Sequence, residues 1–577
     1  MRDFKEYGHN SGNGSGWGRD LLFLLLILGI PFLQFLGGLP LIDPDEGRYA
    51  EIPREMLERG DWITPTLNYV KYFEKPPLLY WANAISLKLF GLNEFAARLP
   101  SALAGLMTVL ATYLVALRLY GRRTALLAAA ILGTSAGFVL QSRIILTDML
   151  LTFWLTAALG SFIVAAQRET RREPSRLWHL FYFSCAMAVL TKGLIGMVFP
   201  GGIAFFYLLC TGRWRLLGRM RLASGLALFL AVTVPWFVAV SLRNPEFARF
   251  FFIHEHFERF TSKVHGRYQP FWFFVPVLAA TMLPWSFFIP GAIGKALRER
   301  RHEGGTAGLF LLIWTFLIFL FFSKSSSKLI PYILPIFPPL AILVAHRLRG
   351  ILEGRGRSAG TALVLLGGIQ LVLGAAALGY ARLPQVAALL GGKMPSLAAP
   401  LERFVSTAPP ITTAACLTVG LLFLLQGVTV LTTSRRKPVI VLAVLIIGSF
   451  LLEIVVPRMI MGGIAASESP RELALKAKSA ATADTALVTF GPMQAVSWYL
   501  SKRVLVTDKP DELEFGSKQG DQSAWFLDRQ ALLRLWQGDK HLLVFLKKRE
   551  LDSLQPDLVP APRTIAVSGR RLLISNR

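Results

Sequence analysis

Long apolar segments constrain the fold of this chain more than any other feature of its sequence. Runs of about 20 mostly apolar residues recur between residues 21 and 456, and a helix of that length crosses about 30 Å of hydrocarbon. Their spacing predicts about thirteen membrane-spanning helices, at 21–41, 98–117, 124–141, 147–166, 177–191, 195–211, 223–242, 271–291, 307–323, 329–346, 360–380, 412–432 and 437–456. We therefore expect an all-α polytopic membrane protein.

The overall composition agrees with a membrane protein and limits the other classes. Of the 577 residues, 53% are hydrophobic, and the mean hydropathy is +0.48. The net charge of +26 would suggest nucleic-acid binding in a soluble protein, but in a membrane protein positive loops held in the cytoplasm explain it first. The cysteines Cys185, Cys210 and Cys416 all fall in apolar segments, without the spacing of a disulfide framework or a zinc finger.

The distribution of basic residues among the loops predicts the orientation. If the basic N-terminus lies in the cytoplasm, every second loop should be rich in Lys and Arg. The loops at these positions carry Arg118, Arg122 and Arg123; Arg168, Arg171, Arg172 and Arg176; Arg213, Arg215, Arg219 and Arg221; Lys295, Arg298, Arg300 and Arg301; Arg347, Arg349, Arg355 and Arg357; and Arg435, Arg436 and Lys437. The alternation places loops 42–97, 243–270 and 381–411 and the C-terminus on the outer side.

Three parts follow from this organisation. Residues 1–20 form a polar N-terminal tail, residues 21–456 a transmembrane domain, and residues 457–577 a small outer domain. Within the transmembrane domain, helical spacing and many aromatic residues predict two or three interfacial helices in loop 42–97, with 78–90 partly inserted.

The outer domain is predicted to have an α/β fold. Short buried strands are predicted from the stretches ALVTF, RVLVT and LLVFL, and helical pieces from MQAVSWYLS and RQALLRLW between them. We find no motif in this domain that carries chemistry.

The stretch DPDEGRYAEIPREMLERGDWITPTLNYVKYFEKPP, residues 43–77, is densely charged although it adjoins the membrane. Under the predicted topology, further unusual polar residues at helix ends gather on the same outer face. They are Asp45, Glu46 and Arg48; Glu74 and Lys75; Arg143 and Asp148; Lys192; His254, His256 and Arg259; and Lys324 and Lys328 with Tyr332. Each alone could be an interfacial charge that snorkels to water, but ionisable groups beside lipid are costly and mark functional sites.

The cations of this set indicate an anionic ligand. Arg48, Lys75, Lys192 and Arg259 could hold a phosphate or pyrophosphate near the interface, because Arg forks and Lys ammonium groups both bind phosphate. A membrane enzyme meets phosphate most readily on a lipid, so we expect a lipid-phosphate substrate. The residues themselves do not identify a sugar.

Asp45 is the strongest catalytic candidate. Its carboxylate could accept a proton from a hydroxyl nucleophile, or stabilise an oxocarbenium-like centre. Asp148 could assist, although Thr147 and Asp148 also suit the start of a helix, where acidic groups are favourable.

The element HEHFER suggests a possible metal site. His254 and His256 are two residues apart, which is not the four-residue helical spacing of metalloprotease ligands. Together with Glu74 they could still bind a zinc-like ion. A hydrogen-bonded interfacial pair is the alternative.

Several of these elements also resemble a known family. The motif DPDEGRYAEI, followed by FEKPPLLYW, RIILTDM, LTKG, the EH-x-x-R element at Glu255–Arg259 and SKSSSKLIPYILP, is similar to the bacterial 4-amino-4-deoxy-L-arabinose lipid A transferases. These are membrane glycosyltransferases of the GT-C type, related to protein O-mannosyltransferases. The resemblance covers roughly residues 20–350, and a C-terminal periplasmic α/β domain is compatible with it.

The resemblance implies roles for the same residues. Asp45 would be the essential acidic residue of the first outer loop. A structural divalent metal would be held by Glu74 and a histidine, for which the EH element favours His256 over His254. The phosphate of an undecaprenyl-phosphate sugar would be held by Arg48, Lys75 and Arg259, with Lys192 and Tyr332 nearby.

The implied reaction is inverting sugar transfer at the periplasmic face of the bacterial inner membrane. With a lipid A phosphate as acceptor, Asp45 would position the sugar or its amine, whereas with a Ser/Thr hydroxyl it would act as a base. No nucleotide cofactor is expected, because neither a P-loop nor a Rossmann fingerprint is present. The alternatives are transfer to protein or to another glycolipid, and a lipid-phosphate transporter, which should show paired repeats that we do not find.

Overall fold

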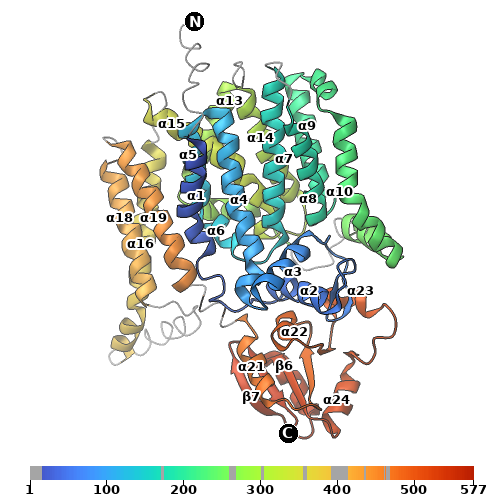
Figure 1. Ribbon diagram of the computed structural model, residues 1–577. Coiled ribbons are helices and arrows are strands. Elements are labelled where there is room, and N and C mark those ends of the chain that lie inside the picture. Colours follow the sequence, from blue (N-terminus) through green and yellow to red (C-terminus); the bar gives the residue numbers. More distant parts are fainter. Residues whose placement is uncertain are drawn as a thin grey trace.

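A bundle of long helices and a smaller C-terminal domain make up the computed structural model (Figure 1). Helix α1 (Trp17–Leu33) begins at the end of the bundle that is farthest from the C-terminal domain. The chain ends within the C-terminal domain. The structure describes residues 16–170, 175–258, 268–300, 305–354, 360–391, 413–433, 437–459, 462, 465 and 468–577.

Every predicted span falls on a helix or a pair of helices. The bundle contains α1, α4 (Glu94–Tyr120), α5 (Arg122–Gly133), α6 (Ala136–Ser142), α7 (Thr147–Thr170), α8 (Leu177–Lys192), α9 (Ile195–Thr211), α10 (Leu222–Arg243), α12 (Phe274–Thr281), α13 (Ile289–Glu299), α14 (Thr306–Lys324), α15 (Phe337–Leu352), α16 (Gly360–Gly391), α18 (Thr413–Thr433) and α19 (Pro438–Met459). Shorter turns are η1 (Trp214–Arg219), η2 (Arg249–Glu258), η3 (Phe271–Phe273), η4 (Trp285–Phe288) and η5 (Ile330–Ile336).

The chain is thus a polytopic helical membrane protein. Among the described residues, 8 helices are long and apolar enough to cross a membrane, or up to 10 if each bent pair is one span. Helices α8 and α9 lie beside α7 in the bundle (Figure 1) but are only 16 and 17 residues long. The number of about thirteen spans stays a prediction.

Two predicted spans are not single helices. The run 124–141 is broken between α5 and α6, which differ in direction by 65°. At the break, the hydroxyls of Thr134 and Ser135 donate to carbonyls four residues earlier, at 2.6 and 2.7 Å, a pattern that bends helices. The run 271–291 bends by 113° at a break that contains Pro284, which has no N–H for the helix.

The segment predicted to be the first outer loop, residues 42–97, forms a compact layer under the bundle, and we keep this name for it below. It contains α2 (Asp45–Arg59), a hairpin of β1 (Thr66–Leu67) and β2 (Val70–Lys71), and α3 (Leu78–Phe90). Gly60 ends α2 with a φ of 65°, which glycine adopts without steric cost. The predicted helices of this loop are therefore present, and α3 leaves Ile85 and Leu89 exposed.

The C-terminal domain contains a mixed sheet with helices beside it. The strand order is β5-β4-β3-β6-β8-β7, with β3 to β6 parallel and β7 and β8 antiparallel. Three strands match the predicted stretches, and the others come from less apolar sequence. The elements are α21 (Arg471–Ala480), β3 (Ala486–Phe490), α22 (Gln494–Leu500), β4 (Leu505–Thr507), η6 (Asp511–Leu513), α23 (Glu514–Ser517), β5 (Phe526–Leu527), α24 (Arg529–Gln537), β6 (Leu542–Lys547), α25 (Lys548–Leu554), η7 (Gln555–Asp557), β7 (Arg563–Ser568) and β8 (Arg571–Ser575).

The C-terminal domain docks tightly on the first outer loop. The side-chain amide of Asn68 donates to the Val504 carbonyl at 2.9 Å and accepts from the Val504 N–H at 3.0 Å. Helix α22 packs on α2 so closely that a Cβ on Gly47 would lie 2.4 Å from the Ala495 nitrogen. Any side chain at Gly47 would therefore push the two helices apart.

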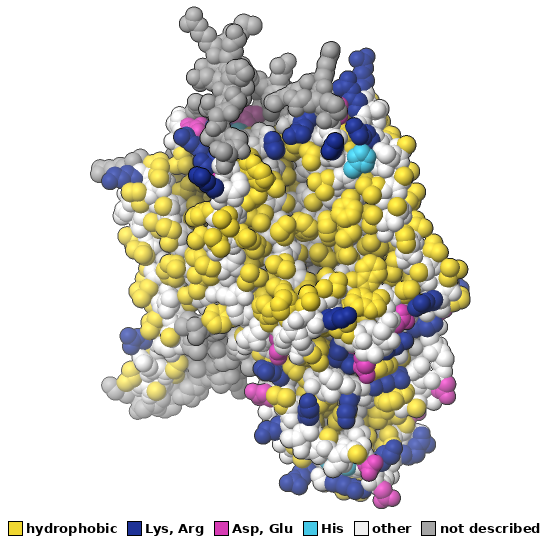
Figure 2. Space-filling view, in the orientation of Figure 1, with side chains coloured by type: hydrophobic (Ala, Val, Ile, Leu, Met, Phe, Trp, Pro, Cys, Tyr) yellow, Lys and Arg dark blue, Asp and Glu magenta, His cyan; other side chains and the backbone are white. Residues whose placement is uncertain are grey.

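The molecular surface separates into two zones. Figure 2 shows hydrophobic side chains over the helical bundle, with Lys and Arg at its far end and a mixed charged surface on the C-terminal domain. Such an apolar zone, far larger than the patches on soluble monomers, fits contact with lipid. The first outer loop lies at the boundary between the zones.

Candidate functional site

Three groups of charged residues lie on the side of the bundle that faces the C-terminal domain, as the sequence predicts. The first begins α2, where Asp45 and Glu46 occupy the first turn and an acidic group is stabilised by the helix dipole. Arg48 is one turn further along, and its Nη2 donates to Asp45 Oδ1. Its Nη1 donates to Glu512 of the C-terminal domain.

Arg48 is held firmly in this group. Its side chain is 8% exposed, and its guanidinium lies 4.8 Å from the ring centroid of Tyr49. The Glu512 side chain is 14% exposed and that of Asp45 38%. Asp45 is therefore the member of the group that a substrate can reach.

The second group joins three membrane helices. Lys192, the last residue of α8, donates to Asp148 Oδ1 at 2.5 Å, and Asp148 lies in the first turn of α7. The Lys192 ammonium also lies 4.8 Å from the ring centroid of Tyr332 in η5, within cation–π range. The structure thus brings together three of the predicted site residues.

The third group contains Glu74 and Lys75. The Lys75 ammonium donates to the Glu74 carbonyl at 2.8 Å and lies 3.8 Å from the Glu74 carboxylate. Both side chains are mostly buried.

Tyr49 lies within electrostatic reach of all three groups. Burial raises the pKa of its phenol above the usual range, and the carboxylates of Asp45, Glu74 and Asp148 raise it further. Tyr49 also packs in one buried cluster with Tyr72 and Ile145, which lie close in sequence to Glu74 and Asp148. We therefore treat the three groups as a single candidate site.

Several buried polar atoms at this site have no hydrogen-bond partner among the described residues. They include the hydroxyls of Tyr72 and Tyr80 and Nε of Arg48. Tyr72 and Tyr80 are 2% and 0% exposed, although the sequence suggested aromatic side chains at the membrane–water interface. Unpaired buried donors are costly, so these atoms suit a polar ligand.

Asp43, just before α2, is a further buried carboxyl. Its Oδ1 accepts the Ala495 N–H at 2.9 Å, while its Oδ2 has no partner in the described part of the chain. Burial raises the pKa of Asp43 to about 6, against the opposing effect of that hydrogen bond.

Other residues of the predicted outer cluster hold the fold together instead. Glu46 accepts two hydrogen bonds from Arg98, both 2.7 Å long. Arg143 donates to the carbonyls of Pro31 and Gln34, and Lys328 donates to backbone carbonyls nearby. Lys324 is exposed.

Part of the predicted site lies outside the described residues. This applies to Arg259 and to the side chains of His254 and His256, whose backbone forms part of the π-helix η2. Within the described residues no group of three His, Cys, Asp or Glu side chains could hold a metal ion. The metal site of Glu74 with one of these histidines therefore stays a prediction.

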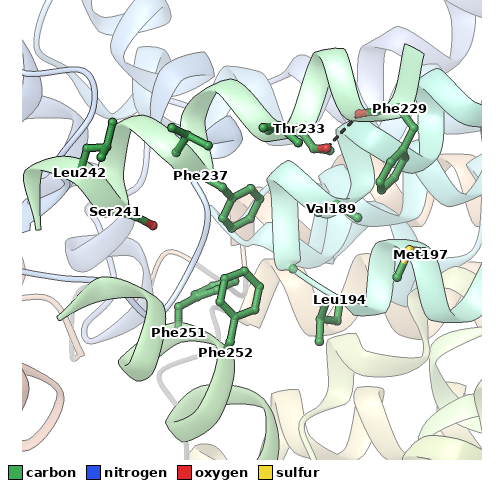
Figure 3. A pocket seen from close by; sticks show the side chains of 13 residues that line it. Val189, Leu194, Met197, Phe229, Thr233, Phe237, Ser241, Leu242, Phe251 and Phe252 are labelled. Atoms are coloured by element: carbon green, nitrogen blue, oxygen red, sulfur yellow. Dashed lines mark hydrogen bonds between the residues drawn. The ribbon is translucent and has the colours of Figure 1, made fainter. Parts of the chain in front are cut away.

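An apolar groove of about 460 Å³ lies beside the second group. It is lined by side chains of α8, α9, α10 and η2, and Gly193, next to Lys192, is at its edge. Figure 3 shows Phe237 of α10 facing Phe251 and Phe252 of η2, with Leu194 and Met197 on the opposite side. Thr233 donates its hydroxyl to the Phe229 carbonyl, so the groove offers mainly hydrocarbon to a ligand.

Two family models match the sequence. Residues 41–251 match the model described as dolichyl-phosphate-mannose-protein mannosyltransferase. Residues 473–576 match that of the aminoarabinose transferase C-terminal domain.

Curated relatives match a little more than half of the chain. The undecaprenyl phosphate-alpha-4-amino-4-deoxy-L-arabinose arabinosyl transferase of Erwinia tasmaniensis is 39% identical over 331 residues, 57% of this chain and 59% of the relative. The protein of that name from Aeromonas hydrophila is 39% identical over 347 residues, 59% and 61% of the two chains. The alignments thus span less than two thirds of these relatives.

Solved structures extend the similarity to nearly the whole chain. The structure of ArnT from Cupriavidus metallidurans bound to undecaprenyl phosphate is 30% identical, covers 98% of both chains and has a TM-score of 0.79. The oligosaccharyltransferase AglB of Archaeoglobus fulgidus is 13% identical, over 85% of this chain and 64% of its own, with a TM-score of 0.50. The second likeness concerns the fold alone.

Proposed function

This chain belongs to the aminoarabinose transferase family, and we propose that it transfers 4-amino-4-deoxy-L-arabinose from undecaprenyl phosphate to a phosphate of lipid A. The observation that carries the proposal is the accessible carboxylate of Asp45 on the same side of the bundle as two ion pairs, Glu74 with Lys75 and Asp148 with Lys192. Residues close in sequence to all three groups pack in one buried cluster. This arrangement offers an accessible carboxylate beside cations that suit a phosphate.

The proposed reaction is an inverting displacement at C1 of the sugar. An acceptor phosphate oxygen forms a bond to C1, the bond from C1 to the donor phosphate oxygen breaks, and its electron pair leaves with undecaprenyl phosphate. Lys75, Lys192 and Arg259 stabilise the charge that develops on the leaving phosphate. Tyr332 and Asp148 hold the Lys192 ammonium in place for this task.

Asp45 acts on the sugar. A phosphate acceptor is already anionic and needs no base, so the carboxylate of Asp45 binds the sugar amine as an ammonium group and orients C1. Its 38% exposed side chain leaves room for this contact while Arg48 holds one oxygen.

The apolar groove receives the prenyl chain of the donor. It begins next to Lys192, is lined by Phe237, Phe251 and Phe252, and lies among membrane helices. A chain bound there places its phosphate near the Lys192 ammonium and gains affinity from buried apolar area.

The proposed location is the inner membrane, with the site and the C-terminal domain in the periplasm and the N-terminus in the cytoplasm. The basic loops support this orientation. Arg122 pairs with Asp20 near the start of α1, and α1 begins at the end of the bundle opposite the C-terminal domain (Figure 1).

The side chains available as ligands at Glu74 fit a structural metal ion. A carboxylate and the imidazole of His254 or His256 are common zinc ligands. The ring of Phe73, next to Glu74, packs 5.2 Å from that of Phe247, just before η2. An ion held by these ligands would link η2 to the first outer loop.

A protein acceptor is the second candidate. It is favoured by the match of residues 41–251 to the protein mannosyltransferase model. A Ser or Thr hydroxyl must lose a proton when it attacks, so Asp45 would then serve as general base.

A reconstituted transfer assay distinguishes these functions. Purified chain in proteoliposomes receives undecaprenyl-phosphate aminoarabinose with either lipid A or a Ser/Thr-rich peptide. We expect product with lipid A, and product with the peptide alone would support the second candidate instead. Absence of product with both acceptors would contradict the proposal.

The same assay tests the groove. Val238→Trp narrows it, whereas Leu226→Trp adds the same side chain on α10 three residues before Phe229, the first lining residue of that helix. Val238→Trp should raise KM for the undecaprenyl donor about ten-fold, with less effect on a farnesyl donor, while Leu226→Trp changes neither. Equal effects on both donors would contradict this placement of the prenyl chain.

A further inference from the structure

A short segment of the C-terminal domain, Asp511–Ser517, reaches the candidate site. It comprises η6 and α23 and follows strand β4. Its sequence DELEFGS resembles an ordinary solvated turn. In the structure, however, one side of the segment packs against the first outer loop, and Leu513 and Gly516 are buried.

Apolar contacts fix this segment in place. Leu513 is buried in one cluster with Tyr49, Tyr72 and Tyr80. The ring of Phe515 lies 4.1 Å from that of Phe250 in η2.

Gly516 permits a closer approach than any other residue would. A Cβ at this position would lie 2.5 Å from the Lys71 carbonyl oxygen. That distance is shorter than van der Waals contact allows, so only glycine fits without a shift of the backbone. The segment is therefore anchored directly after Glu512.

Glu512 is the charged residue that this segment presents to Arg48. Its Oε2 accepts from Arg48 Nη1, and its Oε1 lies 3.5 Å from the side-chain nitrogen of Gln494. A guanidinium is planar and rigid, so fixing Nη1 also fixes the direction of Nη2, which donates to Asp45.

We propose that Glu512 is a positioning residue, through which the C-terminal domain orients Arg48 and thereby the Asp45 carboxylate for sugar transfer. This inference rests on the proposed function for its kinetic test. Without Glu512, Arg48 can turn both terminal nitrogens toward Asp45. The Asp45 carboxylate is then oriented differently, and more of it is bound by Arg48 and is unavailable to the sugar.

The kinetic test compares Glu512→Gln with Glu514→Gln. Glu514 is a matched control, because it lies on the same segment, is exposed and pairs with Lys518. We expect Glu512→Gln to lower kcat by about ten-fold to a hundred-fold, with KM for the donor changed less than about two-fold. Glu512→Asp, which keeps the charge, should recover part of kcat, and Glu514→Gln should match the wild type.

A double-mutant cycle with Arg48 shows whether Glu512 acts through that residue. In an Arg48→Gln background, Glu512→Gln should cause no further loss of kcat. Losses that multiply, or a Glu512→Gln variant as active as Glu514→Gln, would overturn the inference.

The melting temperatures of the wild type, Arg48→Gln, Glu512→Gln and the double variant test the Arg48–Glu512 pair without an activity assay. We expect the Arg48→Gln and Glu512→Gln shifts to be non-additive, because each single change already removes the Arg48–Glu512 ion pair and the second change has no such pair left to break. Additive shifts would overturn the inference. A folded wild type that makes no product would instead contradict the proposed function, and the melting data would still test the Arg48–Glu512 pair.

Discussion

Lys192 and Asp148 form an ion pair of 2.5 Å that links the end of α8 to the start of α7. Both side chains are largely buried, at 11% and 9% exposure. A buried pair adds little stability over an apolar pair of the same shape, but the loss of one partner is costly. The presence of this buried Lys192–Asp148 pair therefore suggests a role in ligand binding, and not in stability alone.

Lys192→Met should both destabilise the protein and stop transfer. The Asp148 carboxylate loses its partner, at a cost of about 3 kcal/mol, and the donor phosphate loses a cation. In the double variant Asp148→Asn/Lys192→Met, thermal unfolding should return close to that of the wild type while transfer stays absent. Recovery of transfer in the double variant would mean that Lys192 only balances Asp148.

Arg98→Ala should destabilise the protein more than any exposed arginine on the same helix. Arg98 binds Glu46 through two hydrogen bonds and donates to the carbonyls of Leu36, Leu39 and Pro40. We expect a loss of about 3 kcal/mol in thermal unfolding.

Arg118→Ala is the control for Arg98→Ala, because Arg118 is exposed near the end of α4. It should change the stability by less than about 0.5 kcal/mol. Equal effects of the two substitutions would show that the Glu46–Arg98 pair does not support the outer loop.

The buried carboxyl of Asp43 should make stability depend on pH. Its pKa is raised by burial from 3.8 to about 6, so between these values the folded state binds more protons than the unfolded state. The stability contributed by this group is therefore present below pH 3.8 and is lost as pH rises toward 6.

Asp43→Asn removes this titration. We expect the melting temperature of the variant, relative to the wild type, to rise between pH 4 and pH 7. Asp539→Asn, at an exposed carboxylate of the C-terminal domain, controls for the loss of one negative charge. A relative melting temperature of Asp43→Asn that falls as pH rises would contradict the burial of Asp43.

Removal of the proposed metal can be followed without an activity assay. Elemental analysis of the purified protein should find about one divalent metal ion per chain, and Glu74→Gln should lose it. Glu58→Gln, at a more exposed carboxylate on α2, should retain it.

Histidine variants then identify the second ligand. Only one of His254→Gln and His256→Gln should lose the ion, and a chelator should lower the melting temperature of the wild type but not of Glu74→Gln. Wild-type protein without bound metal would refute the site.

The sequence predicts those parts of the site that depend on topology or helical spacing. Asp45 and Arg48 are both predicted site residues, and helix α2 brings them into contact because they are three residues apart. Asp148 and Lys192 fall at the outer ends of neighbouring spans, where the alternation of basic loops places them together.

Contacts that depend on tertiary docking could not be predicted. Glu512 lies in a polar turn, and only the packing of Leu513 and Phe515 brings it to Arg48. The sequence suggested Arg48 as a phosphate ligand, whereas both its terminal nitrogens bind carboxylates in the structure.

The aromatic residues of the first outer loop show the same limit. Tyr72 and Tyr80 have the composition of an interfacial loop, and nothing in their spacing predicts that the C-terminal domain covers them. Both tyrosines are buried because residues of the C-terminal domain, including Trp498 and Leu513, pack in the same cluster.

Mass spectrometry of lipid A tests the central claim most directly. The chain is expressed in a host that lacks its own aminoarabinose transferase but makes the donor, beside Asp45→Asn and the Glu514→Gln control. We predict that lipid A gains one aminopentose on a phosphate with the wild type and with Glu514→Gln, but not with Asp45→Asn. Unmodified lipid A from cells that hold the folded wild-type protein, or full modification by Asp45→Asn, would contradict the account.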